Sequence, residues 1–280
     1  MLSYRHAFHA GNHADVLKHY VLGLVLDYMN QKDKPYWYID THAGAGLYRL
    51  TEGYATQNAE FENGIAKLIA AANLLKPLAD FVAQINRFNT SNLEYYPGSP
   101  LVAQDLIRAN DKMRLFELHP SDYKLLIEYF KGQSKQVKID MQDGFTGIKA
   151  CLPPPTRRAV VLIDPPYEDK QDYQHVVRML KDSLSRFATG TFIVWYPILQ
   201  RPEPSEMIED LLRLNLPNWL HINMTIHEPS AEGFGMHGSG LFIINPPWTL
   251  PKILEETIPA LTQLLALDDA AHYALNYEIA

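Results

Sequence analysis

The stretch Val160-Val-Leu-Ile-Asp-Pro-Pro-Tyr167 decides how the rest of the sequence is interpreted. Its apolar run predicts a buried strand that ends at an acid, and open α/β folds bind ligands beyond such strand ends. Neither Pro165 nor the proline after it has a backbone N–H, so carbonyl groups and the Asp164 carboxylate form a lining that only accepts hydrogen bonds. Such a lining suits an exocyclic amino group, and Tyr167 offers a ring on which a base can stack. The alternative is an ordinary strand end at which Asp164 caps a turn.

Short apolar runs alternate with amphipathic stretches of helical length along the whole chain. This alternation predicts an α/β fold with a mostly parallel, seven-stranded sheet covered by helices. We expect strands at residues 36–40, 114–117, 137–141, 159–164, 191–195, 221–226 and 240–244. We expect helices at residues 14–30, 121–130, 173–185, 204–212 and 251–267. The turn-rich residues 228–239 predict that the last two strands form an antiparallel hairpin.

The interval between the first two expected strands is unusually long. The first strand ends at Asp40 and the second at Glu117, 77 residues later, whereas a strand–helix–strand unit needs about 30 residues. The surplus contains two stretches of helical pattern. We therefore predict a single domain over residues 1–280 with a small helical subdomain inserted at residues 53–91. The alternative is that these helices extend the main helical layer.

A glycine-rich loop follows the first expected strand. The segment Asp40-Thr-His-Ala-Gly-Ala-Gly46 places Gly44 and Gly46 where a cofactor can approach the backbone. A nicotinamide enzyme would need a glycine where Arg49 stands, so the loop argues against a dehydrogenase. Taken alone, the loop is equally compatible with a plain strand–turn.

Acids follow the next two expected strands. Glu117 ends the second strand, where a carboxylate can accept both hydroxyls of a ribose. Asp143, followed by Gly144, comes after the third strand and can accept a hydrogen bond from an adenine amino group. Each acid alone is more often an ordinary loop residue. Their succession on neighbouring strands, together with the glycine loop and Asp164, is what favours a binding site.

The first nineteen residues contain four histidines. His6, His9, His13 and His19 suggest a metal site when taken together with Asp15. No His-Glu-x-x-His motif is present, however, and a patch that contacts RNA or lines a cofactor site explains the same residues. We therefore predict no metal.

Two motifs together resemble a known family. Asp-Pro-Pro-Tyr combined with Asp-Thr-His-Ala-Gly-Ala-Gly is similar to class I (Rossmann-like) S-adenosylmethionine-dependent methyltransferases that act on adenine N6 in nucleic acids. The stretch Met1-Leu-Ser-Tyr-Arg-His-Ala-Phe-His-Ala-Gly-Asn-His-Ala-Asp-Val-Leu-Lys-His19 resembles the start of the large-subunit ribosomal RNA adenine-N6 methyltransferase J family. The resemblance runs the full length, including the insertion and Tyr96-Pro-Gly-Ser-Pro100. It implies S-adenosylmethionine as the cofactor and large-subunit ribosomal RNA as the partner.

The resemblance also implies roles for single residues. Those placed at the cofactor are Lys18, His19, His42, Ser99, Glu117 at the ribose, and Asp143 with Gly144 at the adenine. Asp164 grips the target amine, and Tyr4 helps to close the site. The chemistry of the motif adds the Pro165 carbonyl as a second acceptor and Tyr167 as a stacking partner. Arg5 and His6, next to aromatic residues, fit an arm laid over the base.

The predicted reaction is direct methyl transfer to the N6 amine of a flipped-out adenine in ribosomal RNA. A DNA adenine-N6 or cytosine-N4 methyltransferase shares every pocket feature, but it usually needs a larger target-recognition domain than the insertion provides. Members of the family also carry an older label as proteins needed to use external DNA as a nutrient. A binding protein without catalysis would be expected to have lost the Asp-Pro-Pro-Tyr motif or the glycine loop.

Composition restricts the location and partners of the chain. The single cysteine, Cys151, indicates a reducing compartment, and neither a signal peptide nor an apolar membrane span is visible. We therefore expect a cytoplasmic monomer without a membrane partner. The net charge of −7 argues against a nucleic-acid partner. Eleven acids but only two bases follow residue 202, however, so residues 1–202 carry a net charge of +2 and the objection weakens. We expect protein-free RNA, or an early assembly intermediate, to be gripped on one face.

Overall fold

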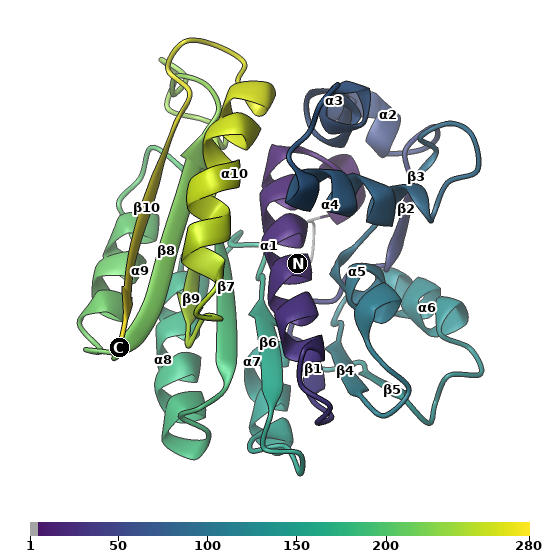
Figure 1. Cartoon of the computed structure of the whole chain (residues 1–280), viewed down its shortest axis with the longest axis vertical. Coiled ribbons are helices and arrows are strands. Elements are labelled where there is room, and N and C mark those ends of the chain that lie inside the picture. The colour runs from purple at the N-terminus through teal and green to yellow at the C-terminus, as the bar shows by residue number, and fades with distance from the viewer. Residues whose placement is uncertain (1–4) are drawn as a thin grey trace.

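The centre of the molecule is one eight-stranded sheet, in the order β10-β8-β9-β7-β6-β1-β4-β5 (Figure 1). The structure, a computed structural model, describes residues 5–280. The strands are β1 (Trp37–Asp40), β4 (Lys112–Phe116), β5 (Val137–Asp140), β6 (Ala159–Ile163), β7 (Thr191–Ile198), β8 (Asn218–Thr225), β9 (Gly238–Ile244) and β10 (His272–Ile279). All seven predicted strands are present, with ends within three residues of the prediction.

Five strands, β5, β4, β1, β6 and β7, run parallel to one another. β9 lies antiparallel between β7 and β8, which confirms the predicted hairpin. The carboxyl ends of the parallel strands therefore meet at one edge of the sheet, where the predicted motifs are located. The sheet has the mostly parallel α/β architecture that the sequence predicted.

β10 corrects the prediction of seven strands, because it pairs antiparallel with β8 as an eighth strand at the edge of the sheet. Its side chains are exposed or half-buried along its whole length. It therefore lacks the apolar run or strict alternation by which a strand is recognised in a sequence.

Helices cover both faces of the sheet (Figure 1). One face carries the core formed by α1 (His13–Asn30), α5 (Ser99–Leu106), α6 (Pro120–Tyr129) and α10 (Leu250–Leu265). The other face carries the core formed with α7 (Gly144–Gly147), η3 (Ile148–Cys151), α8 (Gln171–Arg186) and α9 (Glu203–Leu212). Cover on both faces explains why β6 is an unbroken apolar run. Within residues 5–280, no helix combines the length and apolarity needed to cross a bilayer.

α1 is the central helix, and fourteen of its eighteen residues are buried. It begins after Asn12, whose side chain accepts hydrogen bonds from the backbone N–H groups of Ala14 and Asp15. Two charged residues, Asp15 and Lys18, are among the buried ones. Buried charges require partners, and those partners form part of the candidate site.

The long interval between β1 and β4 contains a two-stranded sheet and short helices. The two strands are β2 (Leu47–Arg49) and β3 (Tyr95–Pro97), and the short helices are α2 (Ala55–Asn58), η2 (Glu60–Asn63), α3 (Ile65–Ala70) and α4 (Lys76–Asn86). A further short helix, η1 (His6–Phe8), precedes α1. Apolar side chains of α3 and α4, such as Ile65 and Phe81, belong to the same core as α1. The division at residues 53–91 stays a prediction.

The interval between β1 and β4 also contacts the start of α1. The Gly11 carbonyl accepts a hydrogen bond from the Ile65 N–H at 2.9 Å. The Glu60 carboxylate accepts one from the Asn12 side-chain amide at 2.9 Å and lies 3.0 Å from His9 Nδ1. These contacts link the residue that caps α1 to the inserted helices.

Candidate active site

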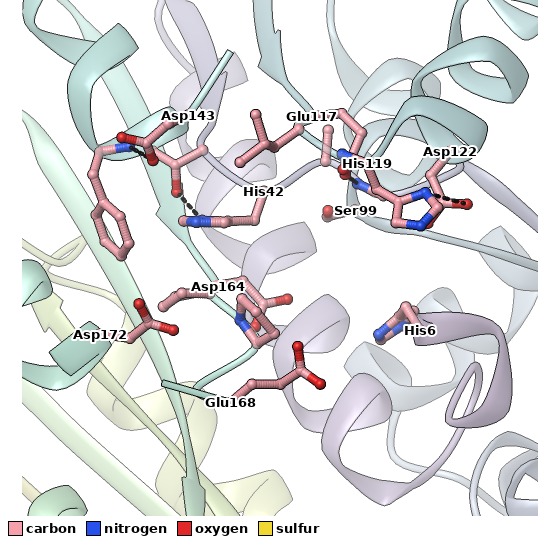
Figure 2. Close-up of a pocket in the computed structure, with 18 of the residues that line it drawn as sticks. His6, His42, Ser99, Glu117, His119, Asp122, Asp143, Asp164, Glu168 and Asp172 are labelled. Atoms are coloured by element: carbon pink, nitrogen blue, oxygen red, sulfur yellow. Dashed lines mark hydrogen bonds and ion pairs between the residues drawn. The ribbon is translucent and has the colours of Figure 1, made fainter. Parts of the chain in front are cut away.

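A cavity of about 1000 Å³ opens at the carboxyl edge of the parallel strands, where α/β folds bind ligands (Figure 2). Figure 2 shows Asp164, Glu117 and Asp143, which follow three different strands, around this one cavity. The predicted site residues that line it are His6, Lys18, His19, His42, Gly44, Ser99, Glu117, Asp143, Gly144, Asp164 and Pro165. The structure therefore brings together residues that are up to 159 positions apart in the sequence, from His6 to Pro165.

Glu117 joins the end of β4 to the glycine loop. Its Oε2 accepts a hydrogen bond from the Gly44 N–H at 2.7 Å, and its Oε1 accepts one from the His119 N–H at 2.6 Å. Gly44 has a φ of +65°, a conformation that favours glycine. Burial raises the pKa of Glu117, although both backbone donors oppose this. Each carboxylate oxygen has a second lone-pair direction, so the fixed group can accept further hydrogen bonds from a ligand.

Asp143 and Gly144 form the turn between β5 and α7. Asp143 Oδ1 accepts a hydrogen bond from the Phe145 N–H at 3.1 Å and caps the helix. A Cβ atom on Gly144 would collide with the Thr41 carbonyl, so only glycine allows the two loops to approach this closely. The turn thus holds the Asp143 carboxyl beside the loop that follows β1.

Asp40 organises the base of the cavity, a function that the sequence analysis did not assign to it. Its Oδ2 accepts hydrogen bonds from the hydroxyls of Tyr38 and Ser99, both at 2.7 Å, and its Oδ1 accepts one from the His42 N–H at 3.2 Å. Burial raises the pKa of Asp40, while these three donors lower it. Ser99 therefore lines the cavity with its hydroxyl donated to Asp40. The position of Asp40 at a strand end was the available signal.

Lys18 forms a buried ion cluster with two carboxylates. Its Nζ lies 2.6 Å from Asp164 Oδ2 and 2.9 Å from Asp15 Oδ1, and the Lys18 side chain is only 4% exposed. Burial opposes the charge on Lys18, but the two carboxylates raise its pKa. Burial likewise opposes the charge on Asp15, but His6 and Lys18 hold its pKa well below the usual range. Lys18 thus fixes one oxygen of Asp164 inside the cavity.

Three of the four N-terminal histidines, His6, His9 and His19, form side-chain hydrogen bonds, whereas the buried Nδ1 of His13 has no hydrogen-bond partner within residues 5–280. His6 Nε2 lies 2.9 Å from Asp15 Oδ2, and His19 Nδ1 lies 2.9 Å from the Tyr96 hydroxyl. Burial lowers the pKa of His19 to about 3 and that of His42 to about 4, so both are neutral near pH 7. Over residues 5–280, no group of three metal-ligating side chains has the arrangement of a metal site.

Stability is expected to fall as the pH drops from about 6.5 toward 4. Burial lowers the pKa of His13, His42 and His221 to about 4 and that of His19 to about 3, whereas these groups have a pKa of 6.5 when exposed. Between these values the unfolded chain binds more protons than the folded chain, so acid favours unfolding. His9 opposes the trend: burial lowers its pKa, but Glu60 raises it above the ordinary value.

His221→Gln tests this expectation by urea denaturation at several pH values. The slope of unfolding free energy against pH near pH 5 should shrink by about 1.4 kcal/mol per pH unit, because one fewer proton is taken up. The control is Asn276→Gln, which changes an exposed residue of β10 without a titratable side chain and should leave the slope unchanged. An unchanged slope in His221→Gln would contradict the expectation.

Tyr167 occupies a different place from the one expected. Its φ is +53°, its side chain is buried, and its hydroxyl donates a hydrogen bond to the Trp195 carbonyl at 2.7 Å. Its ring packs against Tyr173, with the ring centroids 4.3 Å apart. Tyr167 is not among the cavity-lining residues, so this arrangement corrects the expectation that its ring is available for stacking.

Two other predicted residues, Arg5 and Gly46, are also absent from the cavity lining. The Arg5 guanidinium donates to Asp122 Oδ1 on α6 at 2.8 Å. Gly46, with a φ of +86°, packs beneath Leu101 and Leu126. Tyr4 lies outside the described residues.

The cavity has further lining residues that sequence reasoning missed. They include Leu118, His119, Asp122, Gln142, Phe145, Glu168, Asp172 and His175. Several of them directly follow the strand-end acids, and this was the signal by which they could have been found. Phe145 contacts His42 and His175, with ring centroids 5.0 and 5.6 Å apart.

Comparisons with known proteins identify the family. The family model described as "Ribosomal RNA large subunit methyltransferase D, RlmJ" matches residues 33–279. A protein of Escherichia coli K12 named "Ribosomal RNA large subunit methyltransferase J" is 44% identical over 278 residues, and a Haemophilus influenzae protein of the same name is 42% identical over 279; each alignment covers 99% of both chains.

A solved structure agrees with these matches. The crystal structure of a Legionella pneumophila protein superposes with a TM-score of 0.89 at 33% identity, covering 96% of this chain and 98% of that one. The resemblance inferred from the N-terminal stretch is thereby confirmed. The chain belongs to the RlmJ family of ribosomal RNA large subunit methyltransferases.

Proposed function

We propose that the chain transfers the methyl group of S-adenosylmethionine to the N6 amine of one adenine in large-subunit ribosomal RNA. The names of the two full-length relatives support methylation of this RNA. The observation that carries the adenine assignment is the position of Asp164 and Pro165 in the same cavity as Glu117 and Asp143. An acceptor-only lining for an amine thus lies beside side chains suited to a nucleoside.

The residues present fit S-adenosylmethionine. The fixed Glu117 carboxylate can accept two ribose hydroxyls, and Asp143 can accept an adenine amino group. Gly144 leaves room for close approach, since a side chain there would collide with Thr41. When bound, the cofactor supplies a methyl group activated by a sulfonium.

Asp164 and Pro165 would prepare the amine. The lone pair of an aromatic amine is delocalised into the ring, which makes the nitrogen a poor nucleophile. If the amine donates one hydrogen bond to Asp164 and one to the Pro165 carbonyl, a pyramidal nitrogen is favoured, with its lone pair directed toward the methyl group. Lys18 engages Asp164 Oδ2, so we assign Oδ1 to the amine and to the proton that the nitrogen loses.

The target base would have to leave its stack to reach the cavity. His6 lines the cavity, and we retain His6, Arg5 and Tyr4 as the arm that covers the base. Because Tyr167 is buried, stacking on its ring would require this side chain to move. We further propose that the chain acts as a monomer in the cytoplasm, on protein-free RNA or an early assembly intermediate.

The test is transfer of labelled methyl from S-adenosylmethionine to RNA isolated from cells that lack this gene. We expect about one methyl per protein-free large-subunit RNA, recovered as N6-methyladenine, and little on assembled subunits or duplex DNA. Label on duplex DNA alone would favour the DNA methyltransferase alternative. Absence of label on the RNA would overturn the proposal.

A further inference from the structure

A second cavity, of about 480 Å³, lies at the carboxyl ends of β7 and β8 on the side of α9. β8 runs parallel to β7 because both pair antiparallel with β9. Ile198 and Thr225, at the ends of these strands, line the cavity together with Ser205 of α9. The second cavity therefore lies at the same edge of the sheet as the catalytic cavity.

The lining of the second cavity combines apolar side chains with histidine, asparagine, serine and threonine side chains. None of its described lining residues is a lysine or arginine, and Glu209 is the only carboxylate among them. Burial lowers the pKa of His221 to about 4 and also lowers that of His237. A phosphate group would therefore meet no fixed positive charge here, whereas a neutral heterocycle meets aromatic and amide side chains such as Asn223.

His237 has an unsatisfied polar atom in this lining. His237 is only 8% exposed. Its Nδ1 is buried and has no hydrogen-bond partner among residues 5–280. A buried polar atom without a partner costs free energy, which a ligand able to hydrogen-bond to it would recover. No metal-ligating trio includes this histidine within the described chain.

The two cavities are neighbours. Lys170 lines the catalytic cavity, and its Nζ lies 2.6 Å from Glu203 Oε1 at the start of α9. The next two residues, Pro204 and Ser205, line the second cavity. The Lys170–Glu203 ion pair thus joins a lining residue of the catalytic cavity to the start of the helix that lines the second cavity.

The loop between β8 and β9, which supplies two lining residues of the second cavity, also carries an exposed aromatic ring. Pro229 and His237 of the loop line the second cavity, and Phe234, between them in sequence, is 81% exposed. RNA-binding proteins recognise unpaired bases by stacking them on aromatic side chains and hydrogen-bonding to their edges. The same loop thus carries a ring for stacking and lining residues that can form hydrogen bonds.

We propose that the second cavity binds the base of another nucleotide of the RNA substrate, unstacked and close to the target adenine. The inference rests on the proposed function and extends it, because the cavity would select RNA by a base outside the reaction. The lining, which has no lysine or arginine among its described residues, fits a base, and the histidine and asparagine side chains can contact its edges. Phe234 would stack against an adjoining base.

Ser205→Phe tests the proposal by filling the cavity from an exposed position on α9. The KM for protein-free ribosomal RNA should rise at least about tenfold, because base contacts of this kind are lost. The turnover at saturating RNA and the affinity for S-adenosylmethionine should stay unchanged. The matched control is Glu206→Phe, which places the same ring on the next residue, outside the lining. Loss of that acid cannot weaken RNA binding electrostatically, so its KM should not rise.

Phe234→Ala gives an independent test, since an exposed side chain can be removed without disturbing the core. Its KM for RNA should rise about fivefold. The control is Trp248→Ala, which removes a 70%-exposed ring that follows β9 at the opposite edge of the sheet. Wild-type KM values for both Ser205→Phe and Phe234→Ala would overturn the inference.

Failure of the proposed function and failure of the second-cavity proposal give different results. If the wild-type chain methylates no ribosomal RNA, the proposed function fails before the second cavity is tested. If Ser205→Phe impairs methylation of assembled particles but not of protein-free RNA, the occupant is a protein and the inference is overturned.

Discussion

Asp164→Ala is expected to lower turnover about 10²- to 10³-fold while leaving the affinity for S-adenosylmethionine near normal. The variant removes the carboxylate that accepts from the target amine. Glu117, Gly44 and Asp143, which we assign to the cofactor, come from other strand ends and keep their contacts. Single-turnover methylation of ribosomal RNA measures the first effect, and calorimetric titration with S-adenosylmethionine measures the second.

The matched control for this variant is Asp169→Ala. Asp169 also lines the cavity, five residues further along the same segment, and its Oδ1 accepts only from the Gln171 N–H at 2.8 Å among the contacts within residues 5–280. Its turnover should stay within a few-fold of wild type. Methylation at the wild-type rate by Asp164→Ala would refute the assignment of Asp164 to the amine.

Lys18→Met is expected to lower the free energy of unfolding by about 3–5 kcal/mol and to abolish most activity. Methionine has a similar length but leaves Asp15 and Asp164 without the cation that lies between them. In the wild type, the pKa of Asp15 is lower in the folded chain than the 3.8 of the unfolded chain, and this difference stabilises the folded state at any pH above 3.8. The stabilisation is lost as the pH falls below 3.8 and through the folded pKa. The difference between the two proteins should therefore narrow in acid.

Urea denaturation of wild type and variant at pH 7 and at pH 3, below the unfolded pKa of Asp15, measures this difference. Lys76→Met is the control, because the Lys76–Asp80 ion pair is exposed and should contribute no more than about 1 kcal/mol. Equal stability of Lys18→Met and wild type at pH 7 would show that the buried cluster is not held by charge.

The sequence predicts the strands that are buried along their length, because burial requires apolar residues. β6 and β7 are covered on both faces, so every residue from Val160 to Ile163 must be apolar, and the strand is evident from the sequence. β10 lies at the sheet edge and is largely exposed, so nothing in its composition distinguishes it from a loop. Burial, rather than strand propensity, was the signal that could be recognised.

The candidate site divides in a similar way. Acids at strand ends are predictable, because parallel strands bring their carboxyl ends to one edge, and Glu117 and Asp143 both line the cavity. Contacts between distant segments are not predictable from spacing: Lys18 and Asp164 are 146 residues apart, yet they form an ion pair. The direction of the Tyr167 ring depends on its positive φ, which no sequence pattern revealed.

The contacts between Glu60 and the start of α1 have a consequence for how this protein can be shortened or recombined. Glu60 holds Asn12, which caps α1, and α1 carries Lys18 to the centre of the cavity. Excising the inserted helices would therefore remove a support of the catalytic cavity as well as surface. We therefore expect that residues 53–91 cannot be exchanged as an independent module unless the first turn of α1 is secured by other means.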